Sequence, residues 1–343
     1  MSRVLAFDFG ASTGRAILAE YNGEKIEYNE IHRFDNVLCE QNGMLCWDFD
    51  YLLGEVKKAI SLAKNADSLA FDTWGVDYGM LDKNGILVSK PVCYRDDRTK
   101  GMPDKIYQSV SPSKLYAKTG NQIMPINTLF QLTADRTDNA EMFLFMPDLF
   151  AYSLCGAKSV DKTIASTSQM LDLENVEWQK DIFALSGKNE KILPPIVDCA
   201  TVVGEYNGIK VIKVAGHDTQ CAVSAMPCDE NITNAFLSCG TWSLIGCESD
   251  FPILTEKSMN DELSNELGAN GKINYLKNIS GLWLIQEIRR NFRADGKDYS
   301  YLHPEKQKPV RGAKLGENYT KTEVIKRIGE QNYRQKSGAY TGR

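Results

Sequence analysis

The sequence contains the same short unit twice: an apolar strand, a turn of glycine and hydroxyl residues, and a second apolar strand. The first copy runs from Val4 to Ala19 and the second from Asn234 to Gly246. Two such hairpins, each opening a region with further strands and helices, predict a duplicated α/β unit. If the two regions face each other, their turns meet in one cleft and can hold a polyphosphate from both sides.

The turn of the first copy carries groups that suit phosphate. Gly10 and Gly14 allow positive φ and a close approach of the backbone to a ligand. Backbone N–H groups and the hydroxyls of Ser12 and Thr13 can hold phosphate oxygens, and Arg15 adds positive charge. A tight hairpin with polar turn residues explains the same pattern, because the loop is not a Walker A motif and no helix follows it.

Acidic residues stand at the ends of three predicted strands. Asp8 lies just before the first turn, where it can hold Mg²⁺ through water. A later strand ends in Asp72-Thr73-Trp74-Gly75-Val76-Asp77, whose two carboxylates and indole suit sugar recognition. The strand Val211–Val214 runs into Gly216-His217-Asp218-Thr219. Asp218 therefore stands where a base can take a proton from a bound hydroxyl, although an ordinary helix N-cap fits the same position.

The order of the remaining elements predicts two regions. Strands on either side of a crossover helix near residues 49–63 predict a mixed sheet, and residues 103–192 are expected to be mainly helical. Pro194-Pro195, followed by the turn Asn207-Gly208, predicts a linker and a domain boundary at about residues 205–212. In the second region, Asn278 ends a strand and Gln286 lies on the polar side of the helix expected from Ser280, and both are available to a ligand.

Charge and cysteine content exclude several classes of protein. A net charge of −5 gives no footprint of a nucleic-acid binder, and no apolar run approaches the ~20 residues of a membrane span. The nine cysteines are scattered without a Cys-x-x-Cys pair, so neither a zinc site nor a disulfide framework is expected. With no signal-peptide pattern after Met1, we expect a cytoplasmic protein, monomeric or homodimeric, with free thiols and without nucleic-acid or membrane partners.

Eight segments, taken together and in order, resemble the FGGY family of carbohydrate kinases, within the actin/Hsp70-like ATPase superfamily. The resemblance is closest to members that act on L-rhamnulose, and it covers roughly residues 1–301. It implies two actin/RNase H-like domains, each a mixed β-sheet with helices on both faces, over residues 1–208 and 209–301. The segments are residues 8–15, 31–34, 72–77, 94–98, 146–148, 216–219, 238–243 and 277–283.

The resemblance also implies an activity and a set of site residues. It implies that Mg·ATP phosphorylates the 1-hydroxyl of L-rhamnulose and that Asp218 is the proton acceptor, with Asp8 at the metal. The sugar would be held by Gly75, His217, Asp218, Thr219 and Asn278. ATP would be held by Ala11, Ser12, Thr13, Gly14, Arg15, Thr241 and Gln286.

The C-terminal part of the sequence departs from the family pattern. Family chains continue well beyond this length and carry a Gly-Gly-Gly-type loop that holds the adenosine, whereas this sequence has no Gly-Gly pair. From His303 to Arg343 it has ten Lys or Arg against four Asp or Glu and few apolar residues. We expect residues 302–343 to be a poorly ordered basic tail and the second domain to be incomplete.

Three origins fit this tail: a frameshifted or misassembled end of a longer gene, which we favour, a genuine truncation, or a functional basic tail. The chain is then expected to lack much of the adenosine site and to be unstable or weakly active. Two other functions stay open: another FGGY ketose or polyol kinase, and a truncated, inactive sugar-binding remnant.

Overall fold

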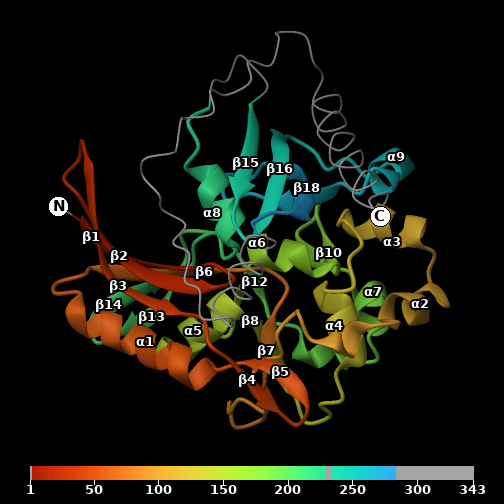
Figure 1. The fold of residues 1–343 in the computed structure, drawn as a ribbon, viewed down its shortest axis with the longest axis horizontal. Coiled ribbons are helices and arrows are strands. Elements are labelled where there is room, and N and C mark those ends of the chain that lie inside the picture. The colour runs from red at the N-terminus through yellow and green to blue at the C-terminus, as the bar shows by residue number, and fades with distance from the viewer. Residues whose placement is uncertain (1, 229–233, 283–343) are drawn as a thin grey trace, which may run out of the picture. The chain divides into compact units, whose positions relative to one another are not determined.

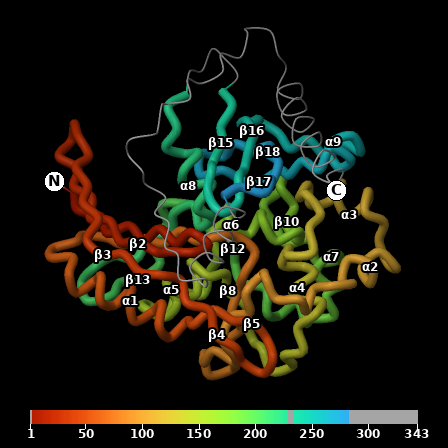
Figure 2. Tube along the Cα trace, in the orientation of Figure 1, coloured from red at the N-terminus to blue at the C-terminus, as the bar shows by residue number. Residues whose placement is uncertain are grey.

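The computed structural model describes residues 2–228 and 234–282. These residues form two compact units. The first comprises residues up to Pro227 together with Glu248–Tyr275, and the second comprises Cys228–Cys247 and the chain from Leu276 onward. Figure 1 shows the elements as a ribbon, and Figure 2 traces the same chain as a tube. The predicted helix after Ser280 and the predicted tail, residues 302–343, fall largely or wholly outside the described residues.

A six-stranded mixed sheet organises the first unit. Its strand order is β13-β14-β6-β1-β2-β3. The strands β1, β2 and β3 are antiparallel neighbours, whereas β6 pairs in parallel with both β1 and β14. The predicted first hairpin and the mixed sheet are therefore confirmed. The strands are β1 (Ser2–Phe9), β2 (Thr13–Tyr21), β3 (Ile26–Asp35), β6 (Ser68–Thr73), β13 (Val202–Tyr206) and β14 (Ile209–Ile212).

Two helices, α1 (Phe49–Leu62) and α5 (Met146–Cys155), lie on the same face of this sheet (Figure 1). Stacked aromatic rings join the sheet to both helices. The ring of Phe150 in α5 lies 4.7 Å from Phe9, 5.5 Å from Phe71 and 5.1 Å from Phe49 in α1. Rings at these offset-stacked distances add about 0.5–1.5 kcal/mol per pair to the apolar burial. Phe150 is therefore the central side chain of this core.

The strand repeat of two separates this core from the polar face of the sheet. Phe7 and Phe9 pack toward α5, so the intervening Asp8 points to the opposite face. Phe71 and Asp72 divide between the faces of β6 in the same way. Asp8 and Asp72 are direct register partners in the parallel pair, and their carboxylates therefore share one face.

Other elements of the first unit surround the sheet. Two helices with a proline in the first turn, Pro112 and Pro147, both end at a glycine with φ near +70°, Gly120 and Gly156. They and their neighbours are α2 (Met102–Tyr107), α3 (Pro112–Thr119), α4 (Thr128–Ala134), α6 (Lys162–Ala165), α7 (Lys180–Ala184), α8 (Asp218–Ser224), α9 (Glu256–Asn260), β4 (Leu38–Gln41), β5 (Met44–Trp47), β7 (Tyr78–Leu81), β8 (Met142–Phe145), β9 (Val160–Asp161), β10 (Leu171–Asp172), β11 (Glu177–Trp178), β12 (Ile196–Val197) and β17 (Ser264–Leu267).

The expected boundary near residues 205–212 differs from the structure. Asn207 and Gly208 have φ of 52° and 81° and form the two-residue turn of the β13–β14 hairpin. Because β14 pairs with β6, both strands belong to the first sheet, and this unit continues to Pro227. A hairpin turn and a linker use the same residue types, so the local sequence did not separate them.

The second unit contains the second predicted hairpin. The strands β15 (Ala235–Cys239) and β16 (Trp242–Ser249) pair antiparallel around a turn at Gly240-Thr241. The hairpin belongs to a four-stranded sheet with the order β15-β16-β18-β17, of which β17 is assigned to the first unit. The strand β18 covers Ile273–Ser280, as predicted from the sequence. Among the described residues, no helix is long and apolar enough to cross a membrane.

Truncation of Phe150 tests the aromatic core. We expect Phe150→Ala to lower the free energy of unfolding by about 3–5 kcal/mol, because it removes three stacked ring pairs at the centre of the core. Urea denaturation followed by circular dichroism measures the loss. Phe251→Ala is the matched control, because Phe251 is 77% exposed, and it should change the stability little. A similar loss in both variants would contradict this description of the core.

Candidate functional site

Three carboxylates gather where three neighbouring strands of the first sheet end. Asp8 lies one residue before the end of β1, Asp72 lies beside it in β6, and Asp218 follows β14 as the first residue of α8. The strand β6 remains paired with the chain after β14 up to its last residue, Thr73. The Thr73 N–H donates to the Gly216 carbonyl at 2.9 Å. The carboxyl edge of parallel strands is the usual ligand site of an open α/β sheet.

Burial and mutual repulsion alter the acidity of these groups. Burial, and then the charges of Asp8 and Asp218, raise the pKa of Asp72 well above its usual value. Burial also raises the pKa of Asp218, with a further contribution from Asp8, while His217 and the Thr219 N–H act in the opposite direction. A raised pKa makes a carboxylate a stronger base, which suits proton abstraction near neutral pH.

The position of Asp218 argues against its being an ordinary N-cap. His217 is the N-cap residue of α8, with extended backbone, and Asp218 is the first helical residue. Its Oδ1 accepts hydrogen bonds from the Thr219 N–H at 2.6 Å and from the Thr219 hydroxyl at 3.3 Å. The side chain remains 33% exposed, so a ligand can reach it. Thr219 itself is buried and acts by holding Asp218 in place.

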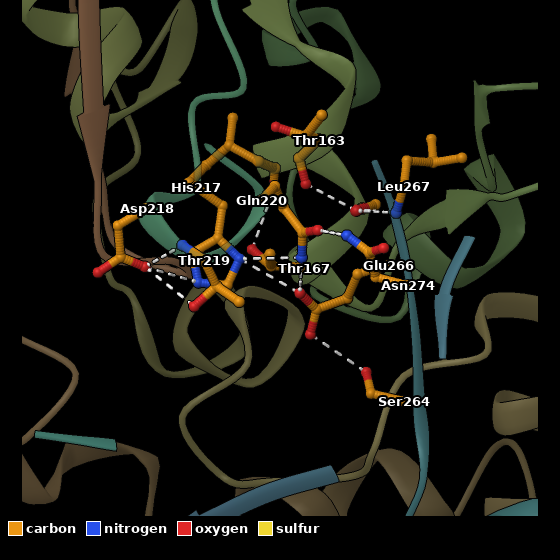
Figure 3. A network of polar contacts seen from close by, with 12 residues as sticks. Thr163, Thr167, His217, Asp218, Thr219, Gln220, Ser264, Glu266, Leu267 and Asn274 are labelled. Atoms are coloured by element: carbon orange, nitrogen blue, oxygen red, sulfur yellow. Dashed lines mark hydrogen bonds and ion pairs between the residues drawn. The ribbon is translucent and has the colours of Figure 1, made fainter. Parts of the chain in front are cut away.

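A buried polar network continues from Asp218 through His217 (Figure 3). The His217 Nε2 atom lies 3.4 Å from the Asp218 Oδ1 atom, and Nδ1 lies 3.2 Å from the Glu266 Oε2 atom. Burial lowers the pKa of His217. The hydrogen bond and the charge of Glu266, together with the charge of Asp218, raise this pKa by more than burial lowers it, so that it lies above 6.5. The imidazolium therefore stabilises the fold below about pH 6.5, and this contribution is lost as the pH rises through the folded-state pKa.

Gly75 stands beside the histidine. A Cβ at position 75 would lie 3.3 Å from the Thr167 hydroxyl and 3.5 Å from the His217 Nε2 atom. The missing side chain thus leaves open the space next to the imidazole. The structure brings together four of the residues expected at the sugar, Gly75, His217, Asp218 and Thr219. Asn278, the fifth, lies on β18 in the second unit.

The turn expected to hold phosphate is short and closed. It spans Gly10 to Ser12, and the carbonyls of these two residues accept hydrogen bonds from Asn36 Nδ2 at 2.5 Å and Asn36 N at 2.9 Å. The expectation of positive φ at Gly10 and Gly14 is wrong. Gly14 is needed for packing, because a Cβ there would lie 2.4 Å from the Phe34 ring.

Arg15 and Asp8 face each other across the hairpin. They are register partners, and the guanidinium NH2 lies 2.5 Å from the Asp8 carboxylate. Arg15 is 45% exposed, which leaves its outer face available to a phosphate. The turn residues Ala11, Ser12 and Thr13 adjoin this pair. Thr241 lies at the turn of the second hairpin in the other unit, and Gln286 lies outside the described residues.

Trp74 and Asp77 are structural rather than sugar-facing, contrary to the expectation for this segment. Asp77 is fully buried, and its Oδ2 accepts hydrogen bonds from the indole N–H of Trp47 at 2.7 Å and of Trp74 at 3.0 Å. The backbone N–H of Tyr94 also donates to Oδ2, and Gln131 donates to Oδ1 at 2.9 Å. The alternation of residues in this segment gave no sign that one of its two acids is a core acceptor.

The sequence also gave no sign of several residues of the network. Glu266 and Asn274 come from β17 and β18, far from His217 in the chain, and nothing near them marks a site. Gln220 follows His217 by three residues on the same face of α8, a helical spacing that could have indicated it. Within residues 2–228 and 234–282, no group of three or more His, Cys, Asp or Glu side chains is arranged to hold a metal ion.

Comparison with known proteins identifies the family of this chain. The sequence pattern of the "FGGY family of carbohydrate kinases, N-terminal domain" matches residues 3–235. The chain belongs to the FGGY family of carbohydrate kinases. The FGGY relatives include two proteins named rhamnulokinase, from Oceanobacillus iheyensis and Halalkalibacterium halodurans, each 38% identical over 84% and 85% of this chain. The chain spans about two thirds of these relatives, 65% and 66% of their lengths.

Solved structures share the fold of this FGGY chain. A ligand-bound xylulose kinase from Lactobacillus acidophilus has a TM-score of 0.71 at 15% identity, with 86% of this chain and 64% of that chain covered. A Plasmodium falciparum glycerol kinase with ADP has a TM-score of 0.67 at 15% identity, over 86% and 64% of the two chains. At these identities the likeness shows the α/β fold alone.

Replacement of Asp77 tests its role as a core acceptor. We expect Asp77→Ala to lower the free energy of unfolding by about 3–5 kcal/mol, because two indole N–H groups and one backbone N–H lose their buried acceptor. Thermal melting and the fluorescence of the tryptophans measure the change. Asp104→Ala, at an exposed position in the first turn of α2, should cost only a few tenths of a kcal/mol. Equal losses would show that Asp77 is not the hub of this core.

Proposed function

We propose that this chain transfers the γ-phosphoryl group of ATP to the 1-hydroxyl of L-rhamnulose, with Asp218 as the proton acceptor. The observation that supports this most is the position of Asp218: a third exposed, at the carboxyl edge of the sheet, with a raised pKa and a fixed Oδ1. The sugar is proposed from the two relatives named rhamnulokinase.

The sugar hydroxyl gives its proton to the Asp218 carboxylate as its oxygen forms a bond to the γ-phosphorus, while the bond from that phosphorus to the bridging oxygen breaks and releases ADP. Phosphoryl transfer depends mainly on positioning and on stabilisation of charge. His217, with its Nε2 beside Gly75, can donate to a sugar oxygen in the space that the glycine leaves open.

The first hairpin is proposed to hold the phosphates. Arg15 can contact phosphate oxygens with its exposed face, and the turn N–H groups of Ala11 to Thr13 can add hydrogen bonds. Within the second unit, Thr241 is placed on the corresponding turn of the second hairpin and is proposed as a further ATP contact. Asn278, and Gln286 beyond the described residues, remain proposals from the resemblance.

Mg²⁺ is proposed to accompany the nucleotide rather than to occupy a site made by protein side chains alone. Asp8 offers hard carboxylate oxygen next to the proposed phosphate turn, and Mg²⁺ commonly takes only one or two carboxylates along with phosphate oxygens and water. The charges of Asp8 and Asp218 raise the pKa of Asp72, and the charge of Asp8 contributes to the raised pKa of Asp218, so a cation nearby is favoured. When bound, the ion would neutralise charge on the transferring phosphate.

A coupled assay of ADP release with L-rhamnulose tests the proposed base. We expect Asp218→Asn to lower kcat by about 10²–10⁴-fold, because the amide cannot take the hydroxyl proton. Asp181→Asn, at an exposed position in α7, is the matched control and should leave kcat unchanged. Turnover in Asp218→Asn equal to that of the unmodified protein would contradict the assignment.

The same assay tests the substrate. A panel of ketoses and polyols, each at equal concentration, should give the highest kcat/KM with L-rhamnulose. A clear preference for another sugar would replace L-rhamnulose and keep the kinase. Binding of L-rhamnulose without ADP release, unaffected by Asp218→Asn, would support a sugar-binding protein without kinase activity.

A further inference from the structure

We propose that Glu266 is a positioning residue for the base: its carboxylate holds His217 as an imidazolium, which in turn keeps Asp218 ionised. This inference rests on the proposed function for its catalytic meaning. It concerns a residue on β17, 48 positions after Asp218 in the chain, that the sequence did not indicate. Figure 3 shows the three side chains in line, with His217 between the two carboxylates.

The first support is the fixed position of Glu266. The residues on both sides of it are tied to the body of the first unit: the Asn265 N–H donates to the Gly120 carbonyl at 2.8 Å, and the Leu267 N–H donates to the Ser166 hydroxyl at 2.9 Å. All four residues of β17 are buried, and Glu266 is only 4% exposed. A strand held on both sides of the glutamate leaves its carboxylate little freedom to turn away from His217.

The second support is the set of donors around the carboxylate. Glu266 Oε2 accepts from Gln220 Nε2 at 2.6 Å and lies 3.2 Å from His217 Nδ1, and Oε1 accepts from the Ser264 hydroxyl at 3.3 Å. The Gln220 amide is oriented by Asn274, whose Nδ2 donates to Gln220 Oε1. Gln220 therefore presents its NH₂ group to Glu266 and cannot accept a proton from the histidine. The Gln220 Nε2 atom also lies 3.5 Å from His217 Nδ1, but Glu266 Oε2 is nearer to Nδ1, at 3.2 Å. The shorter contact is the one in which Nδ1 donates to Glu266.

The third support is that position 266 carries a charged carboxylate, which hydrogen bonding alone does not require. A glutamine at position 266 could accept from Gln220 or Ser264, so hydrogen bonding alone does not call for an acid. Burying a carboxylate is costly unless it is paired, and the ionisable partner in the network is His217. The charged groups that act on His217 are Glu266 from β17 and Asp218 from α8. With Glu266 ionised, the ring can carry a proton on both nitrogens and donate from Nε2 toward Asp218 or the sugar.

The charge on His217 affects the protonation of Asp218, the proposed base. Burial and the nearby Asp8 favour the protonated form of Asp218, and a protonated Asp218 cannot accept the hydroxyl proton. A positive charge on His217, 3.4 Å away, opposes this and favours the ionised form of Asp218. Glu266 thus acts on the reaction through His217 and without touching the substrate.

Proton titration by NMR in Glu266→Gln tests the proposal. The sequence has three histidines, so the imidazole signals can be resolved, and His217→Asn assigns the signal of His217. We expect the His217 midpoint to fall by about one pH unit or more when the charge of Glu266 is removed, and the midpoint of the Asp218 carboxyl to rise. Where the chain turns over L-rhamnulose, the acid limb of kcat against pH should move to higher pH, with about tenfold lower kcat on that limb.

Controls and contrary outcomes separate this inference from the proposed function. Glu256→Gln, at an exposed position in α9, should leave the midpoint and the activity unchanged. An unchanged His217 midpoint in Glu266→Gln would overturn the inference, whatever the activity. Absence of turnover in the unmodified chain would contradict the kinase function but leave the titration to decide the role of Glu266. If Glu266→Gln does not fold, Glu266→Asp, which keeps the charge, should retain a raised midpoint, and a midpoint near 6.5 would overturn the proposal.

Discussion

The parallel register between β1 and β6 is the constraint on which the rest of the site depends. It sets Asp8 beside Asp72, and the hydrogen bond from Thr73 to Gly216 extends the same alignment to the chain that carries His217 and Asp218. Three like charges are thereby brought to one edge of the sheet, at a cost that burial increases. A fold tolerates such a cost where a ligand or a reaction uses it.

The aromatic core makes this register hard to shift. Phe7, Phe9 and Phe71 must face α5 to meet Phe150, and a slip of one residue would turn them to the polar face and the aspartates into the core. The stacking that stabilises the first unit therefore also fixes which side chains reach the site. At the site, the His217 imidazole lies between two carboxylates, 3.4 Å from Asp218 and 3.2 Å from Glu266.

Much of this arrangement was open to prediction from the sequence, for identifiable reasons. The hairpin at Gly10 to Ser12, the helix ends at Gly120 and Gly156, and the strand before His217 follow from local signals of turn residues and apolar runs. The family likewise follows from the ordered motifs, and the match over residues 3–235 confirms it. The second hairpin at residues 235–249 was visible in the same way.

What the sequence did not indicate depends on contacts between distant segments. The local sequence does not distinguish Asp77 from Asp72. In the structure, however, Asp77 accepts hydrogen bonds from Trp47 and Gln131, which lie 30 and 54 positions away in the chain. Glu266 gains its place only because β17 packs against Gly120 and Ser166. The residues Asn207-Gly208 fit a linker as well as a turn, and only the pairing of β14 with β6 identifies them as a hairpin turn.

Titration of the Asp72 carboxyl, followed by ¹³C NMR, tests most directly whether the three strand ends form one coupled site. Asp72 should titrate well above the value of about 4 that is usual for an aspartate, and its midpoint should fall in both Asp8→Asn and Asp218→Asn, because each removes a neighbouring negative charge. A midpoint near 4 in the unmodified protein, or one that neither substitution moves, would contradict the account of a shared carboxylate edge.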